Sequence, residues 1–208
     1  MTAAADSGKG RKRGTAGGSA RRAQLLSIAA GMFAARGYAQ TTVRDIADEA
    51  GILSGSLYHH FSSKEAMLTE ILHGFMDGLL ERSVAIVESG DSPRDILDAL
   101  IRHAFETIHR MPEDVALYQN ESAFLATLPE FKFVSTMSQQ IEKVWIGVLD
   151  AGRMSGVFRK DLDVNLIYRF IRDTVWSSVQ WYRPGGRLGY EKVAEQYLAM
   201  LHDGLLKR

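Results

Sequence analysis

The sequence contains no cysteine and only four prolines among its 208 residues. The lack of cysteine excludes disulfide bonds, thiolate zinc sites and cysteine nucleophiles. No apolar run approaches the ~18 residues that a membrane-spanning helix needs, and the N-terminus has no apolar stretch typical of a signal peptide. We therefore expect a cytoplasmic protein that has no membrane partner.

Motifs for catalysis and nucleotide binding are also missing. The sequence has no G-x-S-x-G, no G-x-x-x-x-G-K-[ST], no H-E-x-x-H and no dinucleotide-binding glycine fingerprint after a strand. His59 and His60 are adjacent, so on a helix they point about 100° apart and cannot share a metal ion. We predict that the chain is not an enzyme and holds neither a metal nor a cofactor.

The charged residues are balanced overall but unevenly distributed. Residues 1–65 hold nine Lys and Arg against five Asp and Glu, whereas the remaining residues hold sixteen against twenty. This asymmetry favours a polyanion as the partner of the N-terminal third. Residues 1–20 combine Ala, Gly, Ser and Thr with a basic cluster at Lys9, Arg11, Lys12 and Arg13. That composition predicts a disordered basic tail over 1–20.

From residue 21 onward, apolar residues recur at spacings of three and four, which is typical of amphipathic helices. Gly37 is expected to end the first of them. Pro93 and Pro112 begin two others, because the N–H that proline lacks is unpaired in a first turn. The predicted fold class is all-α with about nine helices and no strand. Eight of them have the approximate ranges 21–36, 43–50, 54–60, 93–110, 112–125, 130–154, 164–183 and 190–206. A long fourth helix begins near Lys64 and carries apolar residues as far as Leu80.

The segment from 41 to 65 has the pattern of a capped helix, a tight turn and a short second helix. Thr42 is the expected N-cap, Asp45 follows three residues later, and Gly51 lies just past the end of the first helix. Leu57 and Phe61 give the second helix an apolar face. This is helix-turn-helix geometry, in which the second helix enters the major groove of DNA.

Small and polar residues at the start of the second helix suit contacts with DNA. Ser54 and Ser56 are short enough for close approach, and Gly55 lets the backbone come near the phosphates. Tyr58 and His59 offer donors one turn later, and Lys64 is expected to bind a phosphate. The predicted DNA-binding residues are Thr42, Arg44, Ser54, Gly55, Ser56, Tyr58, His59, His60 and Lys64.

The order Leu57-Tyr58-His59-His60-Phe61, followed by Ser63-Lys64-Glu65, resembles the DNA-binding domain of TetR-family transcriptional repressors over about residues 21–70. The resemblance implies a three-helix head and a homodimer that binds a palindromic DNA operator. It also implies a C-terminal pocket whose small-molecule effector releases the DNA. We therefore expect a DNA-binding domain at 21–66 and a ligand-binding and dimerisation domain at 67–208.

The last two predicted helices, 164–183 and 190–206, are apolar over a wide arc. A helix of this kind needs two partners, one inside the chain and one across an interface. We therefore expect the homodimer to form through helices eight and nine. The apolar positions are Leu166, Ile167, Phe170, Ile171, Val175, Val179 and Trp181 in one helix, and Val193, Tyr197, Leu198, Leu201, Leu205 and Leu206 in the other.

Tyr168, Arg172 and Trp176 follow one another at a spacing of four along helix eight. A guanidinium among aromatic and apolar side chains needs a partner, because an unpaired buried charge is costly. Either a carboxylate of the chain or an anionic ligand fits this requirement, and the residues alone leave both open.

Residues 169–176 and 181–186 resemble TetR-family members that control breakdown of the last two sterol rings and are released by a CoA thioester of a ring-degradation intermediate. The resemblance implies that such an acyl-CoA is the effector. The predicted ligand-binding residues are Arg172, Trp176, Tyr168, Tyr118 and Gln119. Three alternatives remain open: a repressor of another hydrophobic or anionic ligand, a helical ligand carrier, and a small helical enzyme acting on an acyl-CoA.

Overall fold

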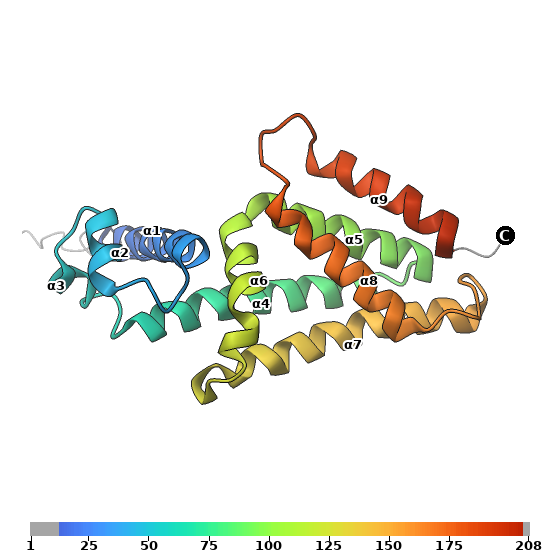
Figure 1. Cartoon of the computed structure of the whole chain (residues 1–208), viewed down its shortest axis with the longest axis horizontal. Coiled ribbons are helices and arrows are strands. Elements are labelled where there is room, and N and C mark those ends of the chain that lie inside the picture. Colours follow the sequence, from blue (N-terminus) through green and yellow to red (C-terminus); the bar gives the residue numbers. More distant parts are fainter. Residues whose placement is uncertain (1–12, 206–208) are drawn as a thin grey trace, which may run out of the picture. The chain divides into compact units, whose positions relative to one another are not determined.

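The structure is a computed structural model that describes residues 13–205. Within that range the chain forms nine α-helices, two short 3-10 helices and no strand, so the prediction of an all-α fold is confirmed (Figure 1). The helices are α1 (Arg13–Arg36), α2 (Val43–Glu49), α3 (Ser54–Leu57), α4 (Lys64–Val87), α5 (Pro93–Arg110), α6 (Pro112–Leu125), α7 (Lys132–Ser155), α8 (Val164–Ser177) and α9 (Tyr190–Leu205). The 3-10 helices are η1 (Pro129–Phe131) and η2 (Ser178–Gln180).

The chain divides into two compact units, Met1–Glu70 and Ile71–Arg208. In the first unit, α2 packs against both α1 and α3. The side chains that fill the space between these helices and the start of α4 are almost completely buried, and they include Leu25, Phe33, Ile46, Leu57 and Met67. This core fixes α3 on its inner side and leaves its other side at the surface.

The turn between α2 and α3 is set by local chemistry. Thr42 caps α2 as predicted, and its exchange of hydrogen bonds with Asp45 forms a complete capping box. At the other end, Ile52 N–H donates to the Ala47 carbonyl at 2.9 Å and Gly51 N–H to the Asp48 carbonyl at 3.1 Å. Gly51 adopts φ +66°, the left-handed conformation that this type of helix ending requires.

In the second unit, α5 occupies the central position and packs against α6, α7, α8 and α9. Its buried face includes Leu97, Leu100, Ile101, Phe105 and Ile108. The chain turns back from α7 towards α8 where the ring of Phe158 lies directly on Gly152. A Cβ at Gly152 would be only 2.2 Å from that ring, so glycine is required there.

In the structure α1 begins at Arg13, within the range 1–20 that the composition predicts to be a disordered tail. Once the packed part of a helix has formed, each further residue adds one hydrogen bond and does not require another unfavourable nucleation step. The helix can therefore extend beyond its packed part towards the N-terminus. Residues 1–12, including Lys9, Arg11 and Lys12, lie outside the described residues.

Two predicted helices end earlier than expected. The range 54–60 shortens to α3 at Leu57, because the N–H groups of both His60 and Phe61 donate to the Leu57 carbonyl and close the chain into a turn. The range 164–183 shortens to α8 at Ser177, followed by η2. There the Ser178 carbonyl accepts from both Trp181 and Tyr182, and the Tyr182 side chain is buried.

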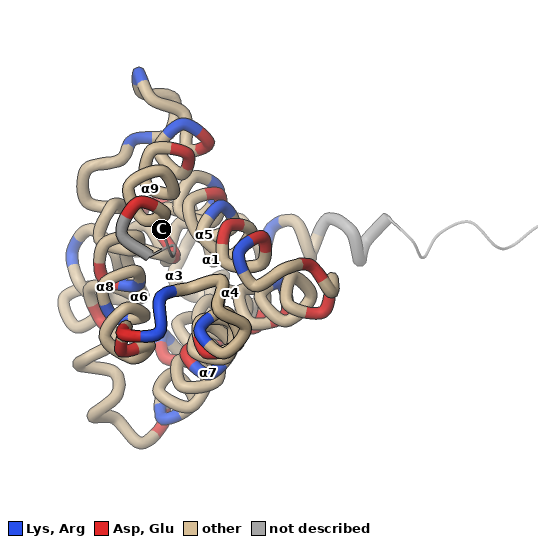
Figure 2. The backbone as a smooth tube through the Cα atoms, turned by 90° about the vertical axis from the view of Figure 1, so that its right-hand side faces the viewer, with Lys and Arg blue, Asp and Glu red and all other residues tan. Residues whose placement is uncertain are grey.

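Across the described residues, no helix is both long and apolar enough to span a bilayer, and no group of three acidic or histidine side chains is arranged to hold a metal ion. Figure 2 shows basic and acidic residues interspersed along the helices. The electrostatic potential at each site is therefore set mainly by the charged side chains close to it.

Candidate functional site

The surface of α3 and of the turn that follows it carries most of the predicted DNA-binding residues. Leu57 is 1% exposed and anchors the helix in the core. Gly55, Ser56, Tyr58 and His59 lie at the surface, and Tyr58 is 56% exposed. The predicted residues Ser54 and His60 are half-buried. An exposed ridge of short side chains, followed by an aromatic hydroxyl and an imidazole, is suited to contact base edges in a major groove.

Two further predicted residues, Thr42 and Arg44, are exposed at the start of α2. The Thr42 hydroxyl donates to the Asp45 carboxylate at 2.6 Å and accepts from the Asp45 N–H at 3.1 Å. The hydrogen bonds from Thr42 hold the pKa of Asp45 below its ordinary value. Among residues 13–205, Arg44 makes only a long, exposed ion pair with Asp48 at 3.8 Å, so its guanidinium remains accessible to a phosphate.

Lys64, predicted to bind a phosphate, makes two hydrogen bonds within the protein. Its ammonium group donates to the carbonyls of Tyr38 and Thr41, both at 2.9 Å, and lies 4.2 Å from the centroid of the Tyr38 ring. An ammonium has three donors, so two of them are used within the protein. The structure therefore gives Lys64 a role in joining the start of α4 to the segment between α1 and α2.

Arg22 is a supporting residue that the sequence patterns did not single out. Its guanidinium donates to both carboxylate oxygens of Glu70, to the carbonyl of His60, and lies 4.1 Å from the centroid of the Phe61 ring. These contacts hold the segment that follows α3. The partners lie 38 to 48 residues away in the sequence, so no local spacing could have identified them.

A cavity of about 280 Å³ in the second unit brings together all five predicted ligand-binding residues. We call it the α8 pocket. Tyr168, Arg172 and Trp176 reach it from α8, and Tyr118 and Gln119 reach it from α6. The residues that sequence reasoning missed come mainly from α4 and α7, with Ser122 on α6 and Asp173 beside Arg172; they include Phe75, Leu79, Ser138 and Glu142. Neither α4 nor α7 carries a motif that would have marked them.

Arg172 is half-exposed in the α8 pocket, not buried as its apolar neighbours suggested. Its Nε donates to the Asp173 carboxylate at 2.7 Å, and its guanidinium lies 5.7 Å from the centroid of the Tyr168 ring. The hydrogen bond to Asp173 raises the pKa of Arg172, which stays charged. Arg172 thus has a carboxylate partner in the chain. Because this ion pair is exposed to solvent, replacing Asp173 by an anionic group of a ligand costs little free energy.

Two tyrosine hydroxyls add further polar groups to the α8 pocket. Ser138 donates its single proton to the Val134 carbonyl at 2.7 Å, so the hydrogen bond of 2.7 Å between Tyr118 and Ser138 has Tyr118 as its donor. The Tyr118 oxygen keeps its lone pairs for an incoming donor. Burial raises the pKa of Tyr168, with Glu142 adding to the effect, and this hydroxyl therefore stays protonated.

Comparison with known proteins places the chain in a family. Residues 25–71 match the family described as bacterial regulatory proteins, tetR family, and residues 90–205 match the tetracyclin repressor-like C-terminal domain. The chain belongs to the tetR family of bacterial regulatory proteins. The predicted resemblance is therefore confirmed over both units.

Within the tetR family, the chain is similar to proteins named HTH-type transcriptional repressor KstR2. The Mycobacterium tuberculosis protein is 52% identical over 90% of this chain and 94% of its own length, and the Rhodococcus jostii protein is 51% identical over 92% and 94%. The relatives are named as transcriptional repressors, which are regulators and not enzymes, so the prediction that this chain is not an enzyme is confirmed.

Solved structures agree with this assignment to the tetR family. The structure of the ketosteroid transcriptional regulator KstR2 of Mycobacterium tuberculosis matches with a TM-score of 0.88 at 52% identity, covering 90% of this chain and 96% of that one. AibR in complex with isovaleryl coenzyme A and operator DNA matches with a TM-score of 0.75 at 25% identity, over 86% and 97%.

Proposed function

We propose that this protein is a ligand-responsive transcriptional repressor that acts as a homodimer on a palindromic operator, in the cytoplasm where that DNA lies. Its effector is an acyl-CoA thioester from sterol ring catabolism. The meeting of Tyr118, Gln119, Tyr168, Arg172 and Trp176 in one cavity carries this proposal. The similar proteins named KstR2, and the ketosteroid regulator among them, support the sterol origin of the effector.

We assign DNA binding to residues 21–66. Tyr58 and His59 are the accessible groups with donors for base edges, and Ser54, Gly55 and Ser56 allow close approach of the backbone. Thr42 and Arg44 stand at the start of α2, where a helix N-terminus and a guanidinium both attract a phosphate. Lys64 and the backbone of His60 hold this surface in place.

We assign ligand binding and dimerisation to residues 67–208. The outer sides of α8 and α9 expose large apolar side chains, of which Leu166, Phe170 and Met200 are 47%, 58% and 64% exposed. A hollow of about 260 Å³ lies between the same two helices. Contiguous exposed apolar surface of this kind is typical of an interface. We call it the α8–α9 face and propose that it is the dimer contact.

The α8 pocket suits the acyl part of the proposed effector. The rings of Phe75 and Trp176 and the apolar side chains of α4 can pack against a fused-ring acid, and the guanidinium of Arg172 can donate to a carbonyl or carboxylate. Pockets that enclose most of a drug-sized ligand measure ~300–1,000 Å³. At about 280 Å³ this pocket has room for the acyl group but not for the whole of coenzyme A.

The test begins with selection of an operator from genomic fragments by the full-length protein. Fluorescence anisotropy then follows release of that operator during titration with the CoA thioester of a bicyclic acid from the last two sterol rings. Free coenzyme A and isovaleryl coenzyme A serve as controls. We expect release at the lowest concentration with the bicyclic thioester. Failure to select any DNA would contradict the repressor assignment, and operator binding that no CoA thioester reverses would contradict the effector class.

A further inference from the structure

Leu53 is an exposed apolar residue that the proposed function does not use. It lies directly before α3, and its side chain is 81% exposed, more than any other large apolar side chain in the described part of the chain. A single exposed leucine is common on protein surfaces and needs no partner by itself. Two local features, however, set Leu53 apart from such residues.

The first feature is the position of Leu53 in the turn. Its backbone is extended, with φ −70° and ψ 143°, and its carbonyl accepts from the N–H groups of Ser56 at 2.9 Å and Leu57 at 3.4 Å. Leu53 is therefore the N-cap of α3. Serine, threonine, asparagine and aspartate are preferred there, because their side chains accept a hydrogen bond from the first turn. The leucine side chain makes no such bond, so the fold by itself disfavours leucine at this position.

The second feature is the glycine two residues further on. Gly55 is exposed within α3, its φ is not positive, and a Cβ added there would meet no other atom within 4 Å. Neither the backbone nor the available space therefore requires glycine, and alanine would stabilise the helix. The fold thus explains neither Leu53 nor Gly55. A molecule that approaches this surface from outside the chain explains both.

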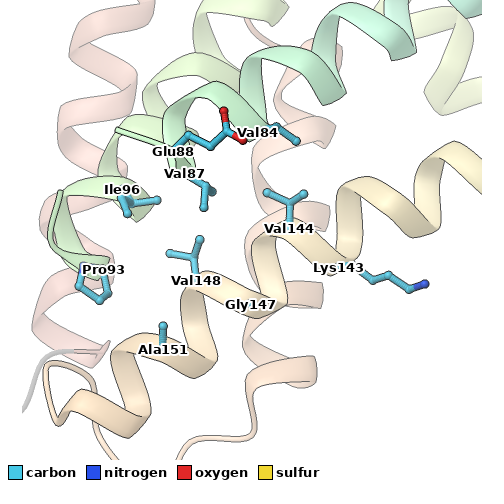
Figure 3. A pocket seen from close by; sticks show the side chains of 10 residues that line it. All are labelled: Val84, Val87, Glu88, Pro93, Ile96, Lys143, Val144, Gly147, Val148 and Ala151. Carbon is cyan, nitrogen blue, oxygen red and sulfur yellow. The ribbon is translucent and has the colours of Figure 1, made fainter. Parts of the chain in front are cut away.

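The surroundings of Leu53 indicate what kind of molecule this is. Val84 is also an exposed apolar residue, but it lines a cavity of about 370 Å³ together with Val144 and Val148, as Figure 3 shows. We call this cavity the α7 groove. Leu53 is followed instead by two serines and a glycine at 54–56. The partner of Leu53 therefore presents a small apolar group within a polar surface.

A thymine in the major groove of DNA has this character. Its C5 methyl group is the only methyl group that the four bases present there, among hydrogen-bond donors and acceptors. A leucine side chain has no polar atom, so this methyl group is the part of a base edge that it can contact favourably. Gly55 permits the close approach that such a contact needs. We propose that Leu53 packs against the C5 methyl group of one thymine in each operator half-site and thereby selects that base. This inference rests on the proposed DNA-binding function.

The experiment removes the methyl groups from the DNA. In the operator selected by the full-length protein, each symmetry-related pair of thymines is replaced in turn by deoxyuridine, which lacks only the C5 methyl group, and fluorescence anisotropy gives the affinity. For the wild type we expect one pair whose replacement weakens binding about fifteenfold, which is about fourfold for each buried methyl group. Leu53→Ser should bind the unmodified operator about as weakly, and the same replacement should then change its affinity by less than about twofold.

Serine suits this comparison because it removes the apolar contact and introduces a favoured N-cap. We therefore expect Leu53→Ser to unfold at the same or a higher urea concentration than the wild type. The ratio of the affinities for the two operators is measured on one protein, so any unfolded fraction cancels from it. Met154→Ser, at an apolar residue of α7 that is 76% exposed, is the matched control and should keep the wild-type ratio.

Gly55→Ala tests the close approach separately. The added methyl group meets no other atom of the chain, so the variant should fold at least as stably as the wild type. It should bind the operator about tenfold more weakly, as loss of one correct base contact does. Gly147→Ala is the matched control, because Gly147 is exposed within α7 and has open space at its Cβ position in the α7 groove (Figure 3). Unweakened binding by Gly55→Ala would overturn the proposal.

The outcomes separate this inference from the proposed function. If the wild type selects no DNA, the repressor assignment and the thymine contact both fail. If it binds an operator but every deoxyuridine replacement has the same effect on the wild type and on Leu53→Ser, only the thymine contact fails. If Leu53→Ser binds the unmodified operator as tightly as the wild type, the proposal is overturned, and the exposed leucine is then left to contact a protein partner.

Discussion

The ammonium group of Lys64 lies 4.2 Å from the centroid of the Tyr38 ring and donates to the carbonyl of the same residue at 2.9 Å. A second hydrogen bond of 2.9 Å reaches the Thr41 carbonyl. One side chain at the start of α4 thereby holds the segment that leads into α2. The lysine that is predicted to bind a phosphate thus also helps to hold the first unit together.

The first prediction concerns the stability of this unit. Lys64→Met keeps most of the aliphatic stem but leaves the carbonyls of Tyr38 and Thr41 without their donor. Hydrogen bonds to a charged group contribute ~1.5–3 kcal/mol, so we expect the free energy of unfolding to fall by an amount in this range. Urea denaturation measures it, with the exposed substitution Lys132→Met as control. If the stability of Lys64→Met were unchanged and its affinity fell equally for operator and random DNA, Lys64 would act as a phosphate contact and not as a support of the fold.

The second prediction divides the DNA contacts by their salt dependence. Arg44→Gln should weaken binding to operator and random DNA alike and reduce the slope of log K against log salt by about 1, as loss of one phosphate contact does. Tyr58→Phe removes a single exposed hydroxyl and should reduce the preference for operator over random DNA. Equal losses on both DNAs from both substitutions would show that the surface of α3 does not read bases.

Local chemistry explains what the sequence predicted well. The Thr42 and Asp45 capping box, the Gly51 ending and the buried Leu57 depend on residues at most a few positions apart, and all three appear as expected. The stripe of Tyr168, Arg172 and Trp176 likewise follows from helical spacing. Its meeting with Tyr118 and Gln119 in one cavity is found in the structure, while their binding of a ligand stays a prediction.

The features that escaped prediction depend on tertiary contacts. The partners of Lys64 lie 23 and 26 residues away, and those of Arg22 lie farther still. The ends of α3 and α8 were misplaced because single carbonyls, those of Leu57 and Ser178, accept two N–H groups and close a turn. Apolar spacing carries no signal of such turns.

The third prediction tests the α8–α9 face. Phe170→Glu places a charge in the middle of an exposed apolar surface and should convert a dimer to a monomer, because burying an unpaired carboxylate is costly. Phe124→Glu, at a phenylalanine that is 47% exposed on α6, is the matched control and should stay dimeric. Light scattering gives the molar mass. A dimeric Phe170→Glu variant would place the interface elsewhere.

The fourth prediction concerns pH. Burial raises the pKa of Asp114 from its ordinary value to about 6. The folded state therefore binds a proton more tightly than the unfolded state, and the free energy of unfolding should decrease as the pH rises from about 4 to about 6. Asp114→Asn should flatten this dependence and raise stability at neutral pH. Glu130→Gln, at an exposed carboxyl on η1, should leave the slope as in the wild type. Urea denaturation across this range checks both.

The fifth prediction separates effector binding from DNA binding. Arg172→Met removes the guanidinium from the α8 pocket but keeps much of the side chain's apolar volume, and the exposed pair with Asp173 contributes little to stability. The variant should fold, dimerise and bind operator as the wild type does, but require about ten- to a hundred-fold more CoA thioester for release. Trp176→Leu should show the same pattern through loss of an aromatic contact.

Arg169→Met is the matched control for Arg172→Met, because Arg169 lies on the same helix, is exposed and does not line the α8 pocket. Operator release followed by anisotropy should therefore shift for Arg172→Met and stay unchanged for Arg169→Met. If Arg172→Met instead lost DNA binding while its affinity for the thioester remained, the contact between Arg172 and Asp173 would be structural. The guanidinium would then have no part in recognition, and Tyr118 would become the polar group to vary next, since its oxygen keeps free lone pairs at the pocket.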